Sequence, residues 1–257
     1  MAGVVSRREG RWPSGFGTPF APPYVIRMSD YERYLRTVEL LALQKTPREM
    51  VHRDELLFQT VHQSSELWLK HAAFEMEEAA QRIDQQNLAL AARLLRRAGL
   101  GLRLVTAQLE MLEQMSPWDY RLIRRVLGTG SGFDSPGFAA TQRAAEAVYT
   151  AFRELLSERG LSLVEVYQRS DEHDAAYRVA ELLIDWDERL ALWRLHHLKI
   201  VERTIGSEAT GTRGTLVSVL RDLTTQRCFP ELWQVRDQLT QLAQQQSDEG
   251  DGGQRKG

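Results

Sequence analysis

Histidine offers the widest range of chemistry in this sequence of 257 residues, because a neutral imidazole binds metals and accepts protons near neutral pH. The six histidines are His52, His62, His71, His173, His196 and His197. None belongs to an HExxH motif or to another closely spaced set of histidine and carboxylate ligands. The sequence also lacks a nucleophile elbow and the paired Glu-x-x-His motifs of a di-iron bundle.

A single cysteine, Cys228, limits the remaining options. One thiol forms no internal disulfide and no multi-thiolate metal site, which suits a reducing cytoplasm. Cys228 precedes Phe229 and Pro230 without a nearby basic signature, so it is a poor candidate for a Cys–His dyad. An enzyme with this sequence would depend on a cofactor that few protein ligands hold.

The segment 193–206 carries the histidine best placed for such a role. Apolar residues recur in it at helical spacing, namely Leu195, Leu198, Val201 and Ile205. His197 shares or borders this face, which we expect to be buried. Two interpretations stay open at this point: an axial ligand for a haem iron, or a core histidine satisfied by a hydrogen bond.

The elements that position these residues are predicted to be helices. Hydrophobic periodicity and end signals place helices at about 30–41, 53–85, 88–115, 118–127, 138–159, 161–168, 171–204, 215–223 and 230–245. Ser116 followed by Pro117 is a typical helix start. The glycine-rich segment 128–133 lacks the preceding strand and the lysine of a phosphate-binding loop. The predicted fold class is all-α.

Length and composition favour one helical domain at residues 29–245. The first 28 residues form a Pro/Gly/aromatic arm, and residues 246–257 a polar tail that we expect to be disordered. A net charge of −2 gives no reason to expect nucleic acid or an anionic membrane as a partner. No apolar run reaches the length of a transmembrane helix or a signal peptide, so we expect a cytoplasmic location.

Five stretches resemble the tryptophan 2,3-dioxygenase family, in the family's order and over about residues 29–236. They are DELLFQTVHQSSELWLK at 54–70, MSPWDYRLIR at 115–124, SGFDS at 131–135, WRLHH at 193–197 with Ile205 and Gly206, and FPELWQVR at 229–236. The resemblance implies an all-α, haem b-dependent homotetramer. Its members use O2 to open the indole C2–C3 bond of L-tryptophan, which gives N-formylkynurenine.

The resemblance also implies roles for single residues around the haem. His197 matches the axial ligand of the iron, and Leu127 and Ser131 match positions near the haem. His62 matches the histidine that accepts a hydrogen bond from the substrate's indole N–H. Phe58, one helical turn before His62, is expected to pack against the indole; for both residues ordinary core packing is the alternative.

The amino-acid end of the substrate has its own predicted contacts. Arg124 matches the arginine that pairs with the carboxylate, for which a guanidinium fork is well suited. Tyr120, one turn earlier, is expected to reach the same site. The resemblance further implies that three residues of the first helix extend into a neighbouring subunit's active site: Tyr31, Tyr34 and Leu35. An aromatic contact within one chain is the alternative for the two tyrosines.

Several positions depart from the family's pattern. The family typically has Gly-Thr-Gly-Gly-Ser-Ser-Gly in the loop that closes over the substrate, and this chain has ATGTRGTL at 209–216. Thr212 is the best match to the family's substrate-binding threonine, and Arg213 replaces a glycine. Asp134 stands where the family has glutamine. Because this loop closes over the substrate, these changes bear on substrate specificity.

Three functions follow as hypotheses. The first is oxygenation of L-tryptophan or a close derivative. The second is oxygenation of a different indole or aromatic compound in specialised metabolism, which the altered loop motivates. The third is a non-catalytic haem-binding protein or helical scaffold, which the combination of Phe58, His62, Tyr120 and Arg124 disfavours.

Overall fold

The computed structural model describes residues 28–254, with side chains up to residue 247. The predicted arm at 1–28 therefore lies outside the described residues except for its last residue, and so do the last three residues of the predicted tail. The chain forms two compact units that divide between Leu43 and Gln44. The predicted domain boundaries at 28 and 245 stay predictions.

The first unit contains two short helices, α1 (Asp30–Leu35) and α2 (Thr37–Leu41). Ser29 begins α1 with a capping box: its hydroxyl accepts the backbone N–H of Glu32, whose carboxylate accepts the backbone N–H of Ser29. The sequence predicted one helix over 30–41, and this was wrong at one point. Arg36 adopts a left-handed conformation with φ of 53°, which ends α1 and separates it from α2.

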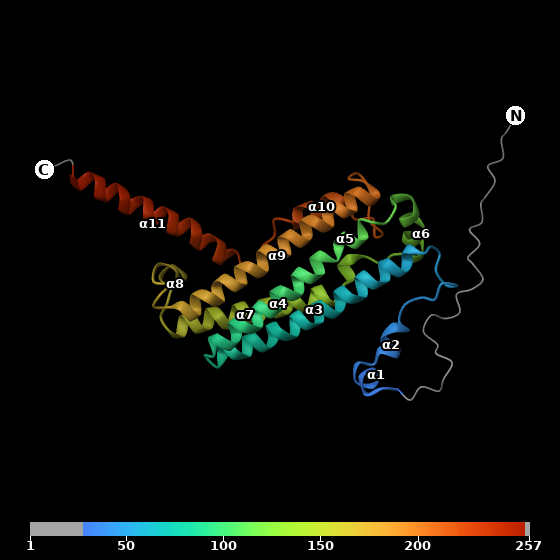
Figure 1. The fold of residues 1–257 in the computed structure, drawn as a ribbon. Helices are drawn as coiled ribbons and strands as arrows, with labels where there is room; N and C mark the ends of the chain where they lie inside the picture. Colours follow the sequence, from blue (N-terminus) through green and yellow to red (C-terminus); the bar gives the residue numbers. More distant parts are fainter. Residues whose placement is uncertain (1–27, 255–257) are drawn as a thin grey trace. The chain divides into compact units, whose positions relative to one another are not determined.

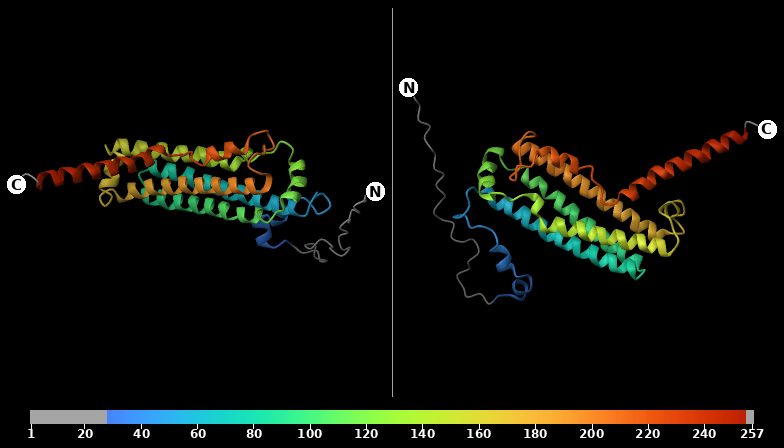
Figure 2. Two further views of the ribbon diagram at one scale, coloured as in Figure 1. Left: turned by 90° about the horizontal axis from the view of Figure 1, so that it is seen from above. Right: turned by 180° about the vertical axis from the view of Figure 1, so that it is seen from behind.

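The second unit is built on four long helices that lie side by side: α3 (Asp54–Asp84), α4 (Leu88–Ala107), α7 (Pro136–Glu158) and α9 (Asp174–Ile205) (Figures 1 and 2). Helix α3 packs against α4 and α7, and α4 packs against α9. Alanines with no solvent exposure lie at these contacts, among them Ala72, Ala79, Ala91, Ala98 and Ala180. Their small side chains let the helix backbones approach closely and leave room for larger neighbours such as Phe152.

Five shorter elements belong to the unit: α5 (Leu109–Leu112), α6 (Pro117–Leu127), the 3-10 turn Gly132–Asp134, α8 (Leu163–Gln168) and α10 (Val217–Leu223). A further long helix, α11 (Pro230–Gln254), follows them. Helices α5, α6 and α10 lie at one end of the four long helices and α8 at the other (Figures 1 and 2). Within the described residues the only extended pairing is an isolated bridge between Thr210 and Leu216. The all-α prediction is confirmed for this part of the chain.

Two predicted helices differ from the structure by more than three residues. The helix predicted over 88–115 is interrupted at Gln108, whose side chain hydrogen-bonds to Ser64 and to the carbonyl of Leu104. Helix α11 continues to Gln254 instead of ending at 245. The glutamines at 244–246 are good helix formers and extend a helix that is already nucleated.

A second core cluster lies where α3, α5, α6 and α9 meet. Its buried members are Val61, Leu109, Leu112, Met115, Ile123 and Ile200. Phe58, Tyr120, Leu127 and Trp193 are partly buried against it. Three of these four are predicted site residues, so the candidate site lies against this cluster.

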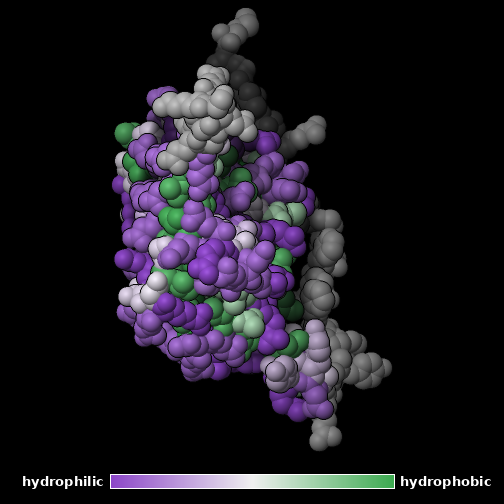
Figure 3. Space-filling view, turned by 90° about the vertical axis from the view of Figure 1, so that its left-hand side faces the viewer, coloured by the Kyte–Doolittle hydropathy of each residue, from purple (hydrophilic) through white to green (hydrophobic). Residues whose placement is uncertain are grey.

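Figure 3 views one side of the molecule, where hydrophilic residues cover most of the surface and hydrophobic residues show between them. Among the described residues, no helix has both the length and the apolar character required to span a bilayer.

Candidate functional site

Helix α3 presents Phe58 and His62 one turn apart, with ring centroids 4.0 Å apart. Nδ1 of His62 lies 2.7 Å from the backbone carbonyl oxygen of Phe58. A carbonyl only accepts hydrogen bonds, so Nδ1 carries the proton and the lone pair of the neutral ring is on Nε2. His62 is therefore prepared to accept a hydrogen bond from a ligand through Nε2.

The protein lowers the pKa of two imidazoles, His62 on α3 and His197 on α9. Desolvation by the surrounding protein lowers the pKa of His62, although its side chain retains access to solvent. Burial, and to a smaller extent the charge of His62, lowers the pKa of His197 to about 4. Both imidazoles are consequently neutral at physiological pH, the form in which they act as metal ligands and hydrogen-bond acceptors.

The ring of His197 stacks on the indole of Trp193, one turn earlier on α9, with centroids 5.0 Å apart and planes 5° from parallel. The indole nitrogen of Trp193 is buried without a hydrogen-bond partner in the described part of the chain. The sequence analysis did not assign Trp193 to the site. Its spacing of four residues from His197 was the available signal, since such residues are neighbours on a helix surface.

The neighbouring His196 has a different environment. Its Nε2 lies 2.8 Å from Oε1 of Glu113, and Arg203 binds the other oxygen of the same carboxylate. His196 is thus held by a carboxylate, and the assignment of His197 as the iron ligand stays a prediction. The predicted burial of Leu195 was wrong, because it is 45% exposed while Leu198 is buried. Leu195 lies two positions before His197, about 200° around the helix, so it faces away.

Helix α6 brings Tyr120, Arg124 and Leu127 to the same cluster. Its start is the predicted one: Pro117 occupies the first turn and the hydroxyl of Ser116 accepts the backbone N–H of Trp118. The ring of Tyr120 lies 6.1 Å from that of Phe58. Burial raises the pKa of Tyr120, and the charge of Arg124 opposes this rise. Tyr120 is therefore a neutral hydroxyl beside a positive charge.

The guanidinium of Arg124 donates to the backbone carbonyl of Thr210, in the loop that follows α9. This bond uses one Nη2 hydrogen and leaves other donors of the fork for an anion. Thr212, two residues further on, donates its hydroxyl to the carbonyl of Gly130 at 2.6 Å. The structure thus brings the predicted carboxylate-binding arginine and the predicted threonine loop together.

Four predicted residues are not placed against the others. Ser131 caps the 3-10 turn, with its backbone N–H donating to Asp134 at 3.1 Å. Tyr31, Tyr34 and Leu35 belong to the first unit, and their side chains are exposed, that of Tyr34 to 87%.

The donor set fits a haem better than a bare metal ion. Within the described residues, no three histidine, cysteine or carboxylate side chains are grouped to hold a metal. His197 is a neutral imidazole without a hydrogen bond to its ring from the described residues, and it stacks on Trp193, which packs against the apolar cluster. Such a residue can give one axial bond to an iron whose porphyrin supplies the other ligands.

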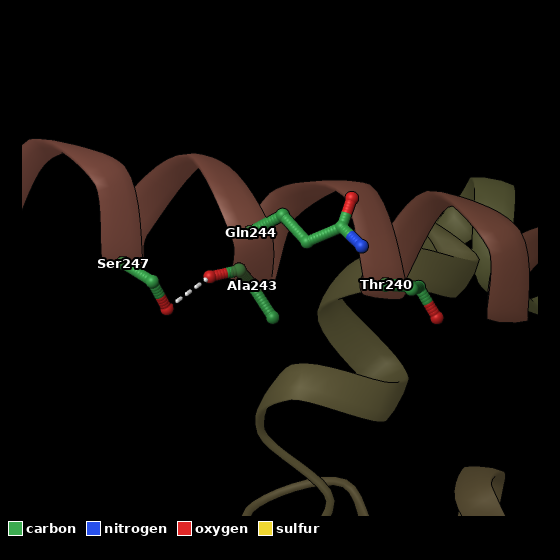
Figure 4. A pocket seen from close by; sticks show the side chains of 4 residues that line it. All are labelled: Thr240, Ala243, Gln244 and Ser247. Atoms are coloured by element: carbon green, nitrogen blue, oxygen red, sulfur yellow. Dashed lines mark hydrogen bonds between the residues drawn. The ribbon is translucent and has the colours of Figure 1, made fainter.

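A separate hollow on α11 has no such chemistry. It is lined by Thr240, Ala243, Gln244 and Ser247 (Figure 4). The hydroxyl of Ser247 donates to the carbonyl of Ala243 at 2.9 Å, a bond within the helix. The lining contains no charged or metal-binding side chain, so we assign no function to it.

Comparison with known proteins gives a consistent result. A family model described as tryptophan 2,3-dioxygenase matches residues 25–144 and 140–239. A tryptophan 2,3-dioxygenase of Myxococcus xanthus (strain DK1622) is 31% identical over 261 residues, covering 82% of this chain and 89% of the relative. One of Erythrobacter litoralis (strain HTCC2594) is 34% identical, covering 80% and 97%. One of Kineococcus radiotolerans (strain ATCC BAA-149 / DSM 14245 / SRS30216) is 30% identical, covering 93% and 99%.

Proposed function

The chain belongs to the tryptophan 2,3-dioxygenase family, and we propose that it uses haem b and O2 to convert L-tryptophan to N-formylkynurenine. The observation that carries the proposal is the cluster in which the ring of Phe58 contacts both His62 and Tyr120, with the charge of Arg124 beside Tyr120. His62 on α3 and His197 on α9 are both neutral imidazoles. An indole amino acid requires this combination of an apolar wall, a hydrogen-bond acceptor and a cation.

His197 would hold the haem iron from α9. Its low pKa keeps the lone pair available for the metal, and the stacked Trp193 restricts rotation of the ring. When bound, ferrous haem supplies the redox chemistry through which O2 reacts with the indole C2–C3 bond. Leu127 packs against the same cluster and would contact the haem, and Ser131 lies in the loop that follows Leu127.

His62 and Phe58 would position the indole. Nε2 of His62 accepts the indole N–H, and Phe58 contacts the ring. Because Nδ1 of His62 is already bound to the carbonyl of Phe58, the imidazole needs no reorientation when substrate arrives. Fixed orientation of this kind lowers the barrier to reaction of the bound ring.

Arg124, Tyr120 and Thr212 would bind the amino-acid end of the substrate. The guanidinium of Arg124 pairs with the carboxylate through the donors that Thr210 does not use. Tyr120 stays protonated near neutral pH because burial raises its pKa, so its hydroxyl can donate to the same group. Thr212 lies in the adjoining loop and contributes a further hydroxyl.

We further propose a cytoplasmic homotetramer in which Tyr31, Tyr34 and Leu35 reach a neighbouring subunit's active site. Their exposure on the single chain supports this, because exposed apolar side chains are common at interfaces. In this arrangement the pocket is complete only in the assembly.

The decisive experiment is product analysis. Protein loaded with haem and reduced is supplied with L-tryptophan and O2, and the product is identified by mass spectrometry. Formation of N-formylkynurenine is expected, with the ketone oxygen and the formyl oxygen both derived from labelled O2. Haem-loaded, reduced protein that consumes no O2 with L-tryptophan contradicts the proposal.

A second candidate substrate is a ring-modified or side-chain-modified indole. The observation that favours it is Arg213 in the substrate loop, where a glycine is typical of the family. O2 consumption with a substituted indole that greatly exceeds consumption with L-tryptophan would select this alternative. Retention of Arg124 restricts the alternative to substrates that carry an anionic group.

A further inference from the structure

Two loops meet beside Arg124, one after α6 (residues 128–134) and one after α9 (residues 207–216). The hydroxyl of Thr212 donates to the carbonyl of Gly130 at 2.6 Å. Nε of Arg213 donates to the carbonyl of Thr129 at 3.3 Å. Nη2 of Arg213 lies 2.5 Å from Oδ1 of Asp134. Three contacts therefore join the tip of one loop to the other loop.

We infer that the ion pair between Arg213 and Asp134 is a latch that holds loop 207–216 in place and thereby positions Arg124 for an amino-acid carboxylate. The inference rests on the proposed function for its substrate class. Arg213 and Asp134 are positioning residues: neither is assigned a contact with substrate, and both act through the loop.

The carboxylate of Asp134 is oriented for this contact by a hydrogen bond that does not involve Arg213. Its Oδ2 accepts the backbone N–H of Ser131 at 3.1 Å, which fixes the carboxylate and leaves Oδ1 for Arg213. Arg213 binds two separate acceptors, the carbonyl of Thr129 and the carboxylate of Asp134. A preorganised carboxylate and a two-point guanidinium contact reduce the side-chain entropy lost in forming the pair.

The loop can transmit this restraint because it is a tight hairpin. Thr210 pairs with Leu216, and the backbone N–H of Gly211 donates to the carbonyl of Thr215 at 2.7 Å. Gly214 has φ of 75°, a conformation that glycine adopts without strain. Arg213 is therefore fixed relative to Thr210, whose carbonyl holds Arg124.

The ion pair is the part of this connection that is particular to this sequence. The other contacts between the loops end on backbone carbonyls, which almost any sequence offers. Arg213 and Asp134 also depart from the pattern of the family, in which glycine and glutamine are typical. A positive charge at one position and a negative charge at the other are what a new ion pair requires.

The test compares Arg213→Gln, Asp134→Asn and the reversed pair Asp134→Arg/Arg213→Asp with the unchanged protein. Asparagine keeps an acceptor for the Ser131 N–H, so Asp134→Asn removes the charge and preserves the turn. Arg178→Gln is the matched control, because it breaks an exposed ion pair with Asp174 on α9, outside both loops. Amide hydrogen exchange of residues 207–216 is measured without substrate, and KM and kcat are measured for L-tryptophan and for tryptamine, which lacks the carboxylate.

Both single variants are expected to exchange faster across residues 207–216 and to raise KM for L-tryptophan about two- to five-fold, the range for an exposed ion pair. We expect kcat, and KM for tryptamine, to change less. The reversed pair restores the values in part, and Arg178→Gln changes none of them. High salt is expected to reduce the difference in exchange and in KM between the unchanged protein and the single variants, since both partners are about half exposed.

Unchanged exchange in both single variants overturns the latch, whatever the activity. Faster exchange in only one of the two single variants also overturns it, because an ion pair is lost when either charge is removed. If L-tryptophan is not a substrate while exchange increases in the single variants and recovers in the reversed pair, the latch stands and the proposed function fails.

Discussion

The imidazole of His197 lies parallel to the indole of Trp193, with ring centroids 5.0 Å apart. The stack occupies one face of the imidazole, so side-chain packing restricts the direction in which its nitrogens point. His196, the next residue, is fixed instead by Glu113 at 2.8 Å. Two adjacent histidines on one helix thus have separate partners.

His197→Ala is expected to abolish stable haem binding, because the other histidine of α9, His196, is already bound to Glu113. Titration with haem, followed by the Soret absorbance, measures this. His196→Ala is the matched control and should bind haem with little change. Equal haem affinity of the two variants would refute the assignment of His197.

His62→Ala is expected to lower kcat/KM for L-tryptophan by about tenfold, the equivalent of about 1.4 kcal/mol for one lost hydrogen bond. The effect should be smaller with 1-methyltryptophan, which has no indole N–H to donate. Steady-state kinetics of both substrates with both proteins separate this bond from a general loss of packing. A loss of the same size for the two substrates would show that His62 does not bind the indole nitrogen.

Arg124→Gln is expected to raise KM for L-tryptophan by about 10- to 100-fold, because a charged hydrogen bond contributes about 1.5–3 kcal/mol. Tryptamine, which lacks the carboxylate, should be affected much less. Arg124→Lys retains the charge but not the fork, so an intermediate KM is expected. A rise that is equal for L-tryptophan and tryptamine would assign Arg124 to holding Thr210 rather than the substrate.

Glu55, at the start of α3, makes the stability of the fold depend on acid pH. Its side chain is 3% exposed, which by itself raises its pKa, but hydrogen bonds from Lys45 and from the backbone of Val51 outweigh burial and lower the pKa below 4.5. Below pH 4.5 the unfolded state therefore binds more protons, so this stabilisation is present above pH 4.5 and disappears as pH falls through the folded pKa.

Glu55→Gln is accordingly expected to lower the free energy of unfolding by about 2 kcal/mol at pH 7, with a smaller difference from the unchanged protein at pH 3.5. Urea unfolding at several pH values gives both numbers. Glu110→Gln, at an exposed glutamate of α5, is the control and should have little effect at either pH. A difference that is independent of pH would contradict the charge-based explanation.

Much of the fold was predictable because its signals are local. Hydrophobic periodicity and caps such as Ser116 and Pro117 depend on residues within one or two turns of each other. The break at Arg36 was missed because its left-handed conformation has no glycine to indicate it. Pairings between distant segments also have no local signal: buried Asp187 accepts hydrogen bonds from the backbones of Cys228 and Phe229 and from the indole of Trp233.

The candidate site likewise has residues that the sequence predicted and a contact between distant segments that it did not predict. The resemblance supplied His62, Arg124 and His197, and the structure brings the helices that carry them to one end of the bundle. It did not supply the contact between Asp134 and Arg213, since a departure from a family pattern does not indicate its partner. Opposite charges at the two departures were the signal, and only the fold shows that the two loops meet.

Helix α7 packs tightly against α3 at Gly137. A Cβ atom at this position would lie 2.7 Å from Cβ of Leu69 and 2.6 Å from a carboxylate oxygen of Glu66. That carboxylate accepts the backbone N–H of Gly137 at 2.8 Å, so it cannot move away without loss of this bond. Gly137→Ala should therefore lower the free energy of unfolding by about 1–3 kcal/mol through overpacking. Gly132→Ala, where no atom lies within 4 Å of the added carbon, is the control. Equal unfolding midpoints for the two variants in urea would show that α3 and α7 do not pack this closely.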